Sequence, residues 1–421
     1  MKIVLCGPPS TGKTCLREAL KQALYKRTGN NPYPYCLPAN PDGDGAWYLP
    51  TAWQFPHEAR RWREIAKKPF AQDFIVRTAR NVKDCQLPLV IFDVGGNPLP
   101  DNVEICHAAT HAVILARDNA GLEEWRGFCQ VAELTIVAEI LSDREAKEDR
   151  VDRDGVDGIL RGMVHRLDRS EPAIDRPMVQ ALADHIVTLL GLPHAGPSSD
   201  SDEPFLMTPG ALGAGFVVLS VGFGRPATNA EIVPAALRRL DQLDLPRGQV
   251  ALFDGPISVP AAAALACRVL EKFEAVGFFD PKLNRFIISG ARGDSTLRPG
   301  SMVTVAEQVG AVQPVSVPSD EIFFVRKAEE TSSGVRVEIG FGSVAAENFD
   351  LVLAALNSLN KLTIAPAFGL LFDGKVSVIV AAALACASAK MYRYVAFLDP
   401  KINRYLVCAS RDAAFPVGAV V

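Results

Sequence analysis

The sequence predicts an α/β protein in which an N-terminal domain with a parallel β-sheet precedes two tandem small α/β modules. Three observations support this prediction. A glycine-rich loop near the N-terminus lies between a strand pattern and a helical pattern. Further apolar strand patterns alternate with helical patterns up to residue 190. The rest of the chain contains one stretch twice, which indicates a duplicated domain.

The repeated stretch covers residues 248–292 and 367–411. Of its 45 aligned pairs, 20 are identical, whereas chance would give roughly one in twenty. The spacing is constant, since Asp254 and Asp373 are 119 positions apart, and so are Asp280 and Asp399. We therefore predict that the two modules share one fold.

Composition favours a cytoplasmic protein that binds neither a membrane nor extended nucleic acid. The 421 residues are enough for two or three domains, and the net charge of −4 argues against a large nucleic-acid surface. Nine cysteines form no C-x-x-C pair, which is typical of reduced thiols. No signal-peptide pattern is present, and the apolar runs are shorter than the roughly 18 residues of a membrane span.

The strongest signal follows the strand pattern of residues 2–6. Residues 7–14 read Gly-Pro-Pro-Ser-Thr-Gly-Lys-Thr, which matches the phosphate-binding loop G-x-x-x-x-G-K-[ST]. In such loops backbone N–H groups converge on phosphate oxygens, the lysine reaches the β- and γ-phosphates, and the hydroxyl binds Mg²⁺. The predicted nucleotide-binding residues are Gly7, Ser10, Thr11, Gly12, Lys13 and Thr14.

A second buried-strand pattern, residues 87–97, contains Asp93-Val-Gly-Gly96 near its end. A carboxylate at the carboxyl end of such a strand is placed to hold Mg²⁺, and the D-x-x-G spacing places the Gly96 N–H near the γ-phosphate. A residue that caps the strand end is the alternative for Asp93. We predict that Lys13, Thr14 and Asp93 are catalytic and that the last two hold Mg²⁺. The chain lacks an N-K-x-D guanine motif, which favours ATP.

Two further regions are candidates for the same site. Asp42 and Asp44 lie in a stretch of turn-forming residues, where an acceptor-orienting base of a phosphotransferase would fit; a solvated loop is the alternative. One arginine between residues 143 and 170 would serve as a lid or finger residue, and a salt-bridged surface is the alternative. The arginines of this region are Arg144, Arg150, Arg153, Arg161, Arg166 and Arg169.

The predicted nucleotide-binding domain ends at residue 192. Residues 194–204 lack apolar periodicity and are rich in Pro, Gly and Ser, so we predict a linker over residues 193–213. The first module then covers residues 214–318 and the second residues 319–421. Each has the pattern β-α-β-α-β-β, with a further short strand at its end.

Several polar residues are identical in the two modules, at a strand-to-helix turn and around a hairpin. A free helix N-terminus with a serine, together with nearby cations, suits an anion. Helix caps, turn formers and surface charges are the alternative. The predicted ligand-binding residues are Gly255, Ser258, Asp280, Lys282 and Arg292, with their equivalents Gly374, Ser377, Asp399, Lys401 and Arg411.

The motifs D-G-x-x-S-V, D-P-K-[LI]-N-R and the following G-A-R or A-S-R resemble those of the CRISPR-associated Csx-three family, also called ring nuclease three. The resemblance covers residues 215–307 and 335–421. It implies divergent CRISPR-associated Rossmann-type modules that pair to bind cyclic tetra-adenylate in type III CRISPR signalling. Some relatives carry an N-terminal P-loop domain. Here the two modules would form a pseudo-dimer within one chain.

The resemblance also implies metal-dependent ring cleavage, ascribed to a histidine shortly before the D-P turn. All six histidines of this chain precede residue 214, so ring binding is expected and ring cleavage stays open. The leading hypothesis is a P-loop ATPase or phosphotransferase that uses ATP with Mg²⁺, or Mn²⁺, and is coupled to modules that bind a cyclic oligoadenylate. A ring nuclease in the repeats and a non-catalytic nucleotide sensor are the alternatives. A homo-oligomer is compatible with each of them.

Overall fold

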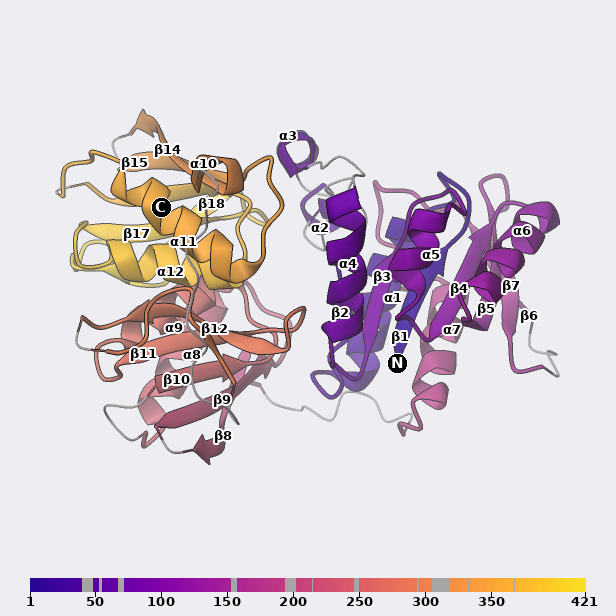
Figure 1. The fold of residues 1–421 in the computed structure, drawn as a ribbon, viewed down its shortest axis with the longest axis horizontal. Helices are drawn as coiled ribbons and strands as arrows, with labels where there is room; N and C mark the ends of the chain where they lie inside the picture. Colours follow the sequence, from indigo (N-terminus) through magenta and orange to yellow (C-terminus); the bar gives the residue numbers. More distant parts are fainter. Residues whose placement is uncertain are drawn as a thin grey trace. The chain divides into compact units, whose positions relative to one another are not determined.

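The computed structural model describes residues 1–421 apart from 40–47, 53–54, 67–71, 153–156, 194–201, 214, 246–249, 294, 305–318, 332–333 and 367. The chain divides into two compact units, essentially residues 1–198 and 199–421. Within the described residues, the first unit contains one β-sheet and the second contains two, and helices pack on all of them (Figure 1). The predicted α/β class is therefore confirmed. Among the same residues, no helix is long and apolar enough to cross a bilayer.

The sheet of the first unit has its described strands in the order β2-β3-β1-β4-β5-β7-β6. Every neighbouring pair is parallel except β6 with β7. The strands are β1 (Lys2–Cys6), β2 (Tyr35–Cys36), β3 (Val90–Asp93), β4 (His111–Ala116), β5 (Thr135–Asp143), β6 (Arg150–Asp152) and β7 (Leu160–His165). The helices are α1 (Lys13–Thr28), α2 (Tyr48–Ala52), α3 (Pro56–Ala66), α4 (Gln72–Asp84), α5 (Pro100–Cys106), α6 (Asn119–Val131) and α7 (Pro177–Leu189).

Helices cover both faces of this sheet, which explains why its central strands are apolar throughout. The layer on one face joins α1 and α7 to the sheet and includes Ile3 and Leu5 of β1. The layer on the other face joins α4, α5 and α6 to the sheet and includes Val4 and Cys6. Alternate side chains of β1 thus enter opposite layers. The loop that follows β1 therefore starts from a strand whose last four residues are fully buried.

The second unit contains two sheets with the same succession of strand pairings. In each, an antiparallel pair is followed by two parallel pairs and a second antiparallel pair. A β-bulge follows Val276 in the first sheet and the equivalent Val395 in the second. The pairing therefore repeats in step with the sequence, and we call the two parts the first and the second repeat.

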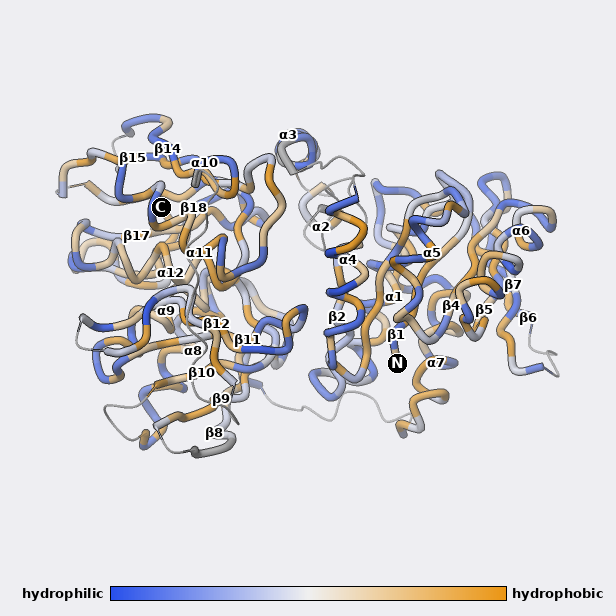
Figure 2. The backbone as a smooth tube through the Cα atoms, viewed as in Figure 1, coloured by the Kyte–Doolittle hydropathy of each residue, from blue (hydrophilic) through white to orange (hydrophobic). Residues whose placement is uncertain are grey.

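The first repeat contains β8 (Phe205–Gly213), β9 (Phe216–Phe223), α8 (Asn229–Gln242), β10 (Val250–Asp254), α9 (Val259–Val269), β11 (Ala275–Asp280), β12 (Arg285–Ala291) and β13 (Met302–Val303). The second contains α10 (Ser319–Ile322), β14 (Phe323–Glu330), β15 (Val335–Phe341), α11 (Asn348–Asn360), β16 (Leu370–Gly374), α12 (Val378–Ser388), β17 (Tyr394–Asp399) and β18 (Arg404–Ser410). In Figure 2 hydrophobic residues follow the central strands, whereas hydrophilic ones gather near the turn between β14 and β15.

Strand β8 lies within the segment that the sequence predicts to be a linker, residues 193–213. It pairs antiparallel with β9 at the edge of the sheet. Pro209 and Gly210 resemble turn residues in the sequence, but an edge strand tolerates proline because one of its sides makes no ladder hydrogen bonds. The sheet of the first repeat thus begins before residue 214.

The two repeats meet through α9 and α12, which pack against each other (Figure 1). Helix α12 also packs on β12 of the first repeat, and α9 packs on β18 of the second. Residues 261–266 and 381–385 are almost fully buried, and most of them are alanine. Such small side chains let the two helices approach closely, which explains why this run is retained in both repeats.

A reciprocal pair of hydrogen bonds links the repeats. The Asn348 side chain at the start of α11 donates to Asp280 Oδ2 at 2.7 Å, and its equivalent, Asn229 of α8, donates to Asp399 Oδ2 at 2.9 Å. Both aspartates are 1% exposed. Each repeat therefore holds the hairpin aspartate of the other, as a pseudo-twofold arrangement requires.

Removing one of these bonds is expected to weaken the association of the repeats. Asn348→Ala should lower the free energy of unfolding by about 2 kcal/mol, because a buried carboxylate loses an amide donor. Calorimetric melting of the full chain measures the effect, and Asn357→Ala, an exposed change on the same helix, is the control. A double-mutant cycle with Asp280→Ala that gave no coupling energy would contradict this interpretation.

Candidate functional site

The loop between β1 and α1 has the backbone conformation that its glycines predict. Gly7 and Gly12 have φ angles of 140° and 93°, and Ser10 also lies in the left-handed region at 58°. A Cβ atom on Gly7 would lie 1.9 Å from the Leu115 carbonyl oxygen, and one on Gly12 would lie 2.6 Å from the Leu167 Cβ. Strand β4 and the segment after β7 therefore leave room for glycine alone at these two positions.

Lys13 lies inside this loop. Its side chain is buried, and Nζ donates to the carbonyl oxygens of Gly7 at 2.6 Å and Pro8 at 2.8 Å. The Thr11 hydroxyl donates to the Pro8 carbonyl at 3.0 Å. The loop is thus wrapped around an ammonium group at the N-terminus of a 16-residue helix, where unpaired N–H groups also favour an anion.

The parallel pairing of β1 with β3 brings Asp93 to the same edge of the sheet. The Thr14 hydroxyl donates to Asp93 Oδ2 at 3.0 Å, although the two residues are 79 positions apart. A Cβ atom on Gly96 would lie 2.5 Å from the Pro9 nitrogen, so the segment after β3 contacts the loop directly. The structure therefore brings together Gly7, Ser10, Thr11, Gly12, Lys13, Thr14, Asp93 and Gly96, as the sequence predicts.

Arg17 belongs to this cluster, and the sequence analysis did not identify it. Its Nη1 donates to Asp93 Oδ1 at 2.6 Å, and the two side chains are 3% and 1% exposed. Burial alone would lower the pKa of Arg17, but the charge of Asp93, the hydrogen bond to it and the nearby Cys36 and Glu18 together hold that pKa above its ordinary value. Thr14 and Arg17 thus fix the orientation of the Asp93 carboxylate.

Arg117 is a second residue that the sequence analysis missed. It follows β4, the neighbour of β1 on the side opposite β3. Its Nη2 donates to the Pro9 carbonyl at 3.0 Å and to the Ser10 carbonyl at 3.3 Å. An exposed guanidinium therefore lies at the rim of the loop, where it would contact a phosphate more readily than the buried Arg17.

The other candidates around this loop have mixed outcomes. Asp42 and Asp44 lie outside the described residues, as does Arg153. Arg150 pairs with Asp152 at 2.9 Å, and Arg161 pairs with Asp157 at 2.7 Å and with Glu139 at 3.0 Å, which favours a surface role for both. Arg166, with a φ of 37°, directly precedes Leu167, the residue that contacts Gly12. The backbone of Arg166 therefore adjoins the residue that packs on the loop.

The predicted ligand residues of the repeats separate into two groups at opposite ends of the sheets. In the first repeat, Asp280 pairs with Arg285 at one end of the β11–β12 ladder, whereas Ala275 pairs with Ala291 at the other. Arg292 therefore lies far from Asp280, and the same register in β17–β18 separates Arg411 from Asp399. The ten residues predicted from the sequence to bind a ligand therefore do not form one surface.

The first group lies at the carboxyl ends of the parallel strands, where ligands of open α/β sheets bind. Gly255 and Gly374 have φ angles of 124° and 143°, and a Cβ atom on either would lie about 2 Å from a carbonyl oxygen of the adjacent strand. The Ser377 hydroxyl donates to Asn348 Oδ1 at 2.8 Å, which extends the network from Asp280. The Ser258 hydroxyl is buried and has no hydrogen-bond partner among the described residues.

The aspartates and lysines of this group differ in exposure. Asp280 and Asp399 are buried and joined to the opposite repeat, so they position the hairpins. Lys282 is partly exposed and Lys401 is exposed. A ligand at this end would therefore contact the two lysines and the N-termini of α9 and α12. No group of three or more His, Cys, Asp or Glu side chains in the described part of the chain is arranged to hold a metal ion.

Comparison with known proteins adds no relative: no protein-family model matches the chain, and no curated protein is significantly similar to it.

Proposed function

We propose that the first unit binds and hydrolyses ATP, or transfers its γ-phosphoryl group, and that the repeats bind a cyclic oligoadenylate in type III CRISPR signalling. The observation that carries the first part is the wrapping of the loop around Lys13, beside the Thr14–Asp93 pair. The second part rests on the resemblance of the repeats to the Csx-three family and on their pseudo-twofold contacts.

The residues of the loop suit a nucleoside triphosphate. Its N–H groups and the start of α1 would hold the phosphates, and the Lys13 ammonium would exchange two carbonyl oxygens for phosphate oxygens. Thr14 and Asp93 supply hard oxygen ligands, which fits Mg²⁺, directly at Thr14 and through water at Asp93. When bound, the metal neutralises charge on the β- and γ-phosphates. Gly96 and Arg117 would contact the γ-phosphate from two sides.

The repeats suit a symmetric polyanion. At the carboxyl ends of its parallel strands, each repeat has an equivalent helix N-terminus, capped by Ser258 or Ser377. Each also has an equivalent lysine, Lys282 or Lys401. A ring of phosphodiesters would meet the same donors in each half. Asp280 and Asp399 would then position the hairpins, and the lysines would contact the phosphates.

Calorimetry with cyclic tetra-adenylate tests the second part. The full chain is expected to bind the ring at micromolar concentration, and Lys401→Gln should weaken binding about tenfold, the effect of one charge-assisted contact. Lys361→Gln, an exposed lysine of the second repeat paired with Asp320, is the control. If cyclic adenylates of no ring size bind, the signalling assignment fails and the nucleotide assignment stands alone.

Product analysis on radiolabelled ring, with and without ATP and Mg²⁺ or Mn²⁺, separates the alternatives. Linear products that persist in a Lys13→Ala chain would assign cleavage to the repeats. Phosphate release that disappears in the same chain, with ring binding retained, is the result that the proposal expects.

A further inference from the structure

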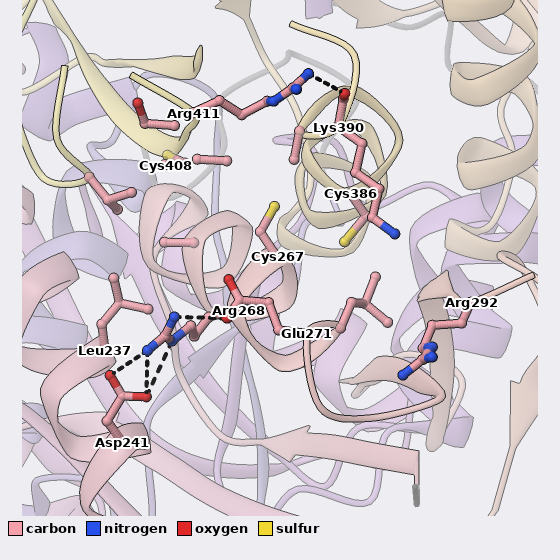
Figure 3. Close-up of a pocket in the computed structure, with 16 residues that line it drawn as sticks. Leu237, Asp241, Cys267, Arg268, Glu271, Arg292, Cys386, Lys390, Cys408 and Arg411 are labelled. Atoms are coloured by element: carbon pink, nitrogen blue, oxygen red, sulfur yellow. Dashed lines mark hydrogen bonds and ion pairs between the residues drawn. The ribbon is translucent and has the colours of Figure 1, made fainter. Parts of the chain in front are cut away.

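A cavity of about 830 Å³ lies where the repeats meet (Figure 3). The strand registers place it at the end opposite Asp280 and Asp399. Residues of both repeats line it, from the ends of α9 and α12 and from the segments that follow β12 and β18. Its walls include the apolar side chains of Leu237, Leu270 and Val417. Volumes of this order are typical of sites for small molecules rather than for macromolecular partners.

The charges that line the cavity are predominantly positive. The lining contains four cationic side chains, those of Arg268, Arg292, Lys390 and Arg411. It contains two carboxylates, Asp241 and Glu271. Both carboxylates pair with Arg268, at 3.1 Å and 2.8 Å, and so neutralise the first repeat's helical arginine. Lys390, Arg411 and Arg292 are all exposed to solvent. The excess of positive charge occurs in a chain whose net charge is −4, which makes it a local feature.

The side chains at the centre of the cavity add no negative charge. Cys267 and Cys386 are equivalent residues of the two repeats, and Figure 3 shows both near the middle of the cavity. A hydrogen bond with Cys267, and burial, raise the pKa of the Cys386 thiol, and burial raises the pKa of Cys408. Cys386 and Cys408 therefore stay neutral, and together with the apolar walls they suit an uncharged ring system.

The geometry of the second repeat's cations points to phosphate. Arg411 Nη1 donates to the Lys390 carbonyl oxygen at 2.7 Å, which brings the guanidinium to the C-terminus of α12 (Figure 3). The Lys390 side chain runs from there toward Cys386, so its ammonium adds a second positive charge nearer the middle of the cavity (Figure 3). Guanidinium and ammonium groups are both common partners of phosphate groups.

We propose that this cavity binds a phosphorylated ligand of one or two nucleotides in size, with its phosphates at Lys390, Arg411 and Arg292. The site is separate from the carboxyl-end surface proposed for the cyclic oligoadenylate and from the Gly7–Thr14 loop. It does not depend on either assignment, because the cavity and its charges belong to the interface of the repeats.

Equilibrium dialysis of the full chain with a radiolabelled linear adenylate dinucleotide carrying a 5′-phosphate tests this site. We expect saturable binding, weakened about tenfold by Lys390→Gln and by Arg411→Gln. Lys361→Gln, which changes an exposed lysine away from the cavity, should leave the affinity within about twofold. Lys390 is exposed, so its variant should melt at the wild-type temperature.

Protection of Cys267 from maleimide provides a second readout. Cys267 is partly exposed in the cavity, so bound dinucleotide should slow its modification severalfold, as measured by peptide mass spectrometry. Cys36, a partly exposed cysteine of the first unit, is the internal control. Absence of binding, or binding that neither cavity substitution weakens and that leaves Cys267 unprotected, would overturn the proposal.

Discussion

Replacing Lys13 by alanine is expected to lower ATP hydrolysis by at least about 10²-fold, the usual loss when one preorganised donor to a developing negative charge is removed. The buried ammonium donates to two loop carbonyls, whereas the Arg117 guanidinium lies at the exposed rim. Phosphate release under saturating ATP and Mg²⁺ is the measurement. Thr14→Ala should give a comparable loss together with a higher requirement for Mg²⁺, because its hydroxyl lies next to Asp93.

Lys26→Ala is the matched control. Lys26 lies on the same helix, but its side chain is 59% exposed and pairs with Asp175 at 3.5 Å on the surface. This substitution removes the same charge from α1 and should leave hydrolysis unchanged within about twofold. Retention of more than a tenth of the activity in Lys13→Ala, at an unchanged melting temperature, would contradict a role for the loop in phosphate chemistry.

The sequence predicts the core of this site because its residues follow a local rule. The loop residues are contiguous, and Asp93 is recognised by its place at the end of an apolar strand. Arg17 and Arg117 follow no such rule. Arg17 becomes significant only when β1 and β3 are known to be neighbours, and Arg117 only when β4 is placed on the other side of β1. An arginine one turn after Thr14, within a buried helix, was the available signal.

In the repeats, by contrast, residues that are close in the sequence do not lie together in the structure. Asp280 and Arg292 were grouped because they are close in the chain and identical in both copies, but the antiparallel hairpin places them at opposite ends of its strands. The burial of Asp280 could not be predicted either, since its partner Asn348 belongs to the other repeat. The duplication itself identifies equivalent positions, although it does not say which of them face each other.

Replacing Arg17 by methionine is expected to destabilise the first unit by about 3–5 kcal/mol, because the substitution leaves the buried Asp93 carboxylate without its cationic partner. All four tryptophans lie before residue 199, so tryptophan fluorescence during urea unfolding follows this unit alone. Lys26→Met, at the exposed pair with Asp175, should cost no more than about 1 kcal/mol.

The double variant Arg17→Met/Asp93→Asn distinguishes a buried charge from mere loss of packing. With the carboxylate replaced by an amide of similar size, the penalty for an unpaired charge disappears, so the double variant should be more stable than Arg17→Met alone. It should still fail to hydrolyse ATP if Asp93 acts on Mg²⁺. Equal or greater destabilisation in the double variant would show that Arg17 stabilises the unit through packing, and Asp93 would then have to be oriented by Thr14 alone.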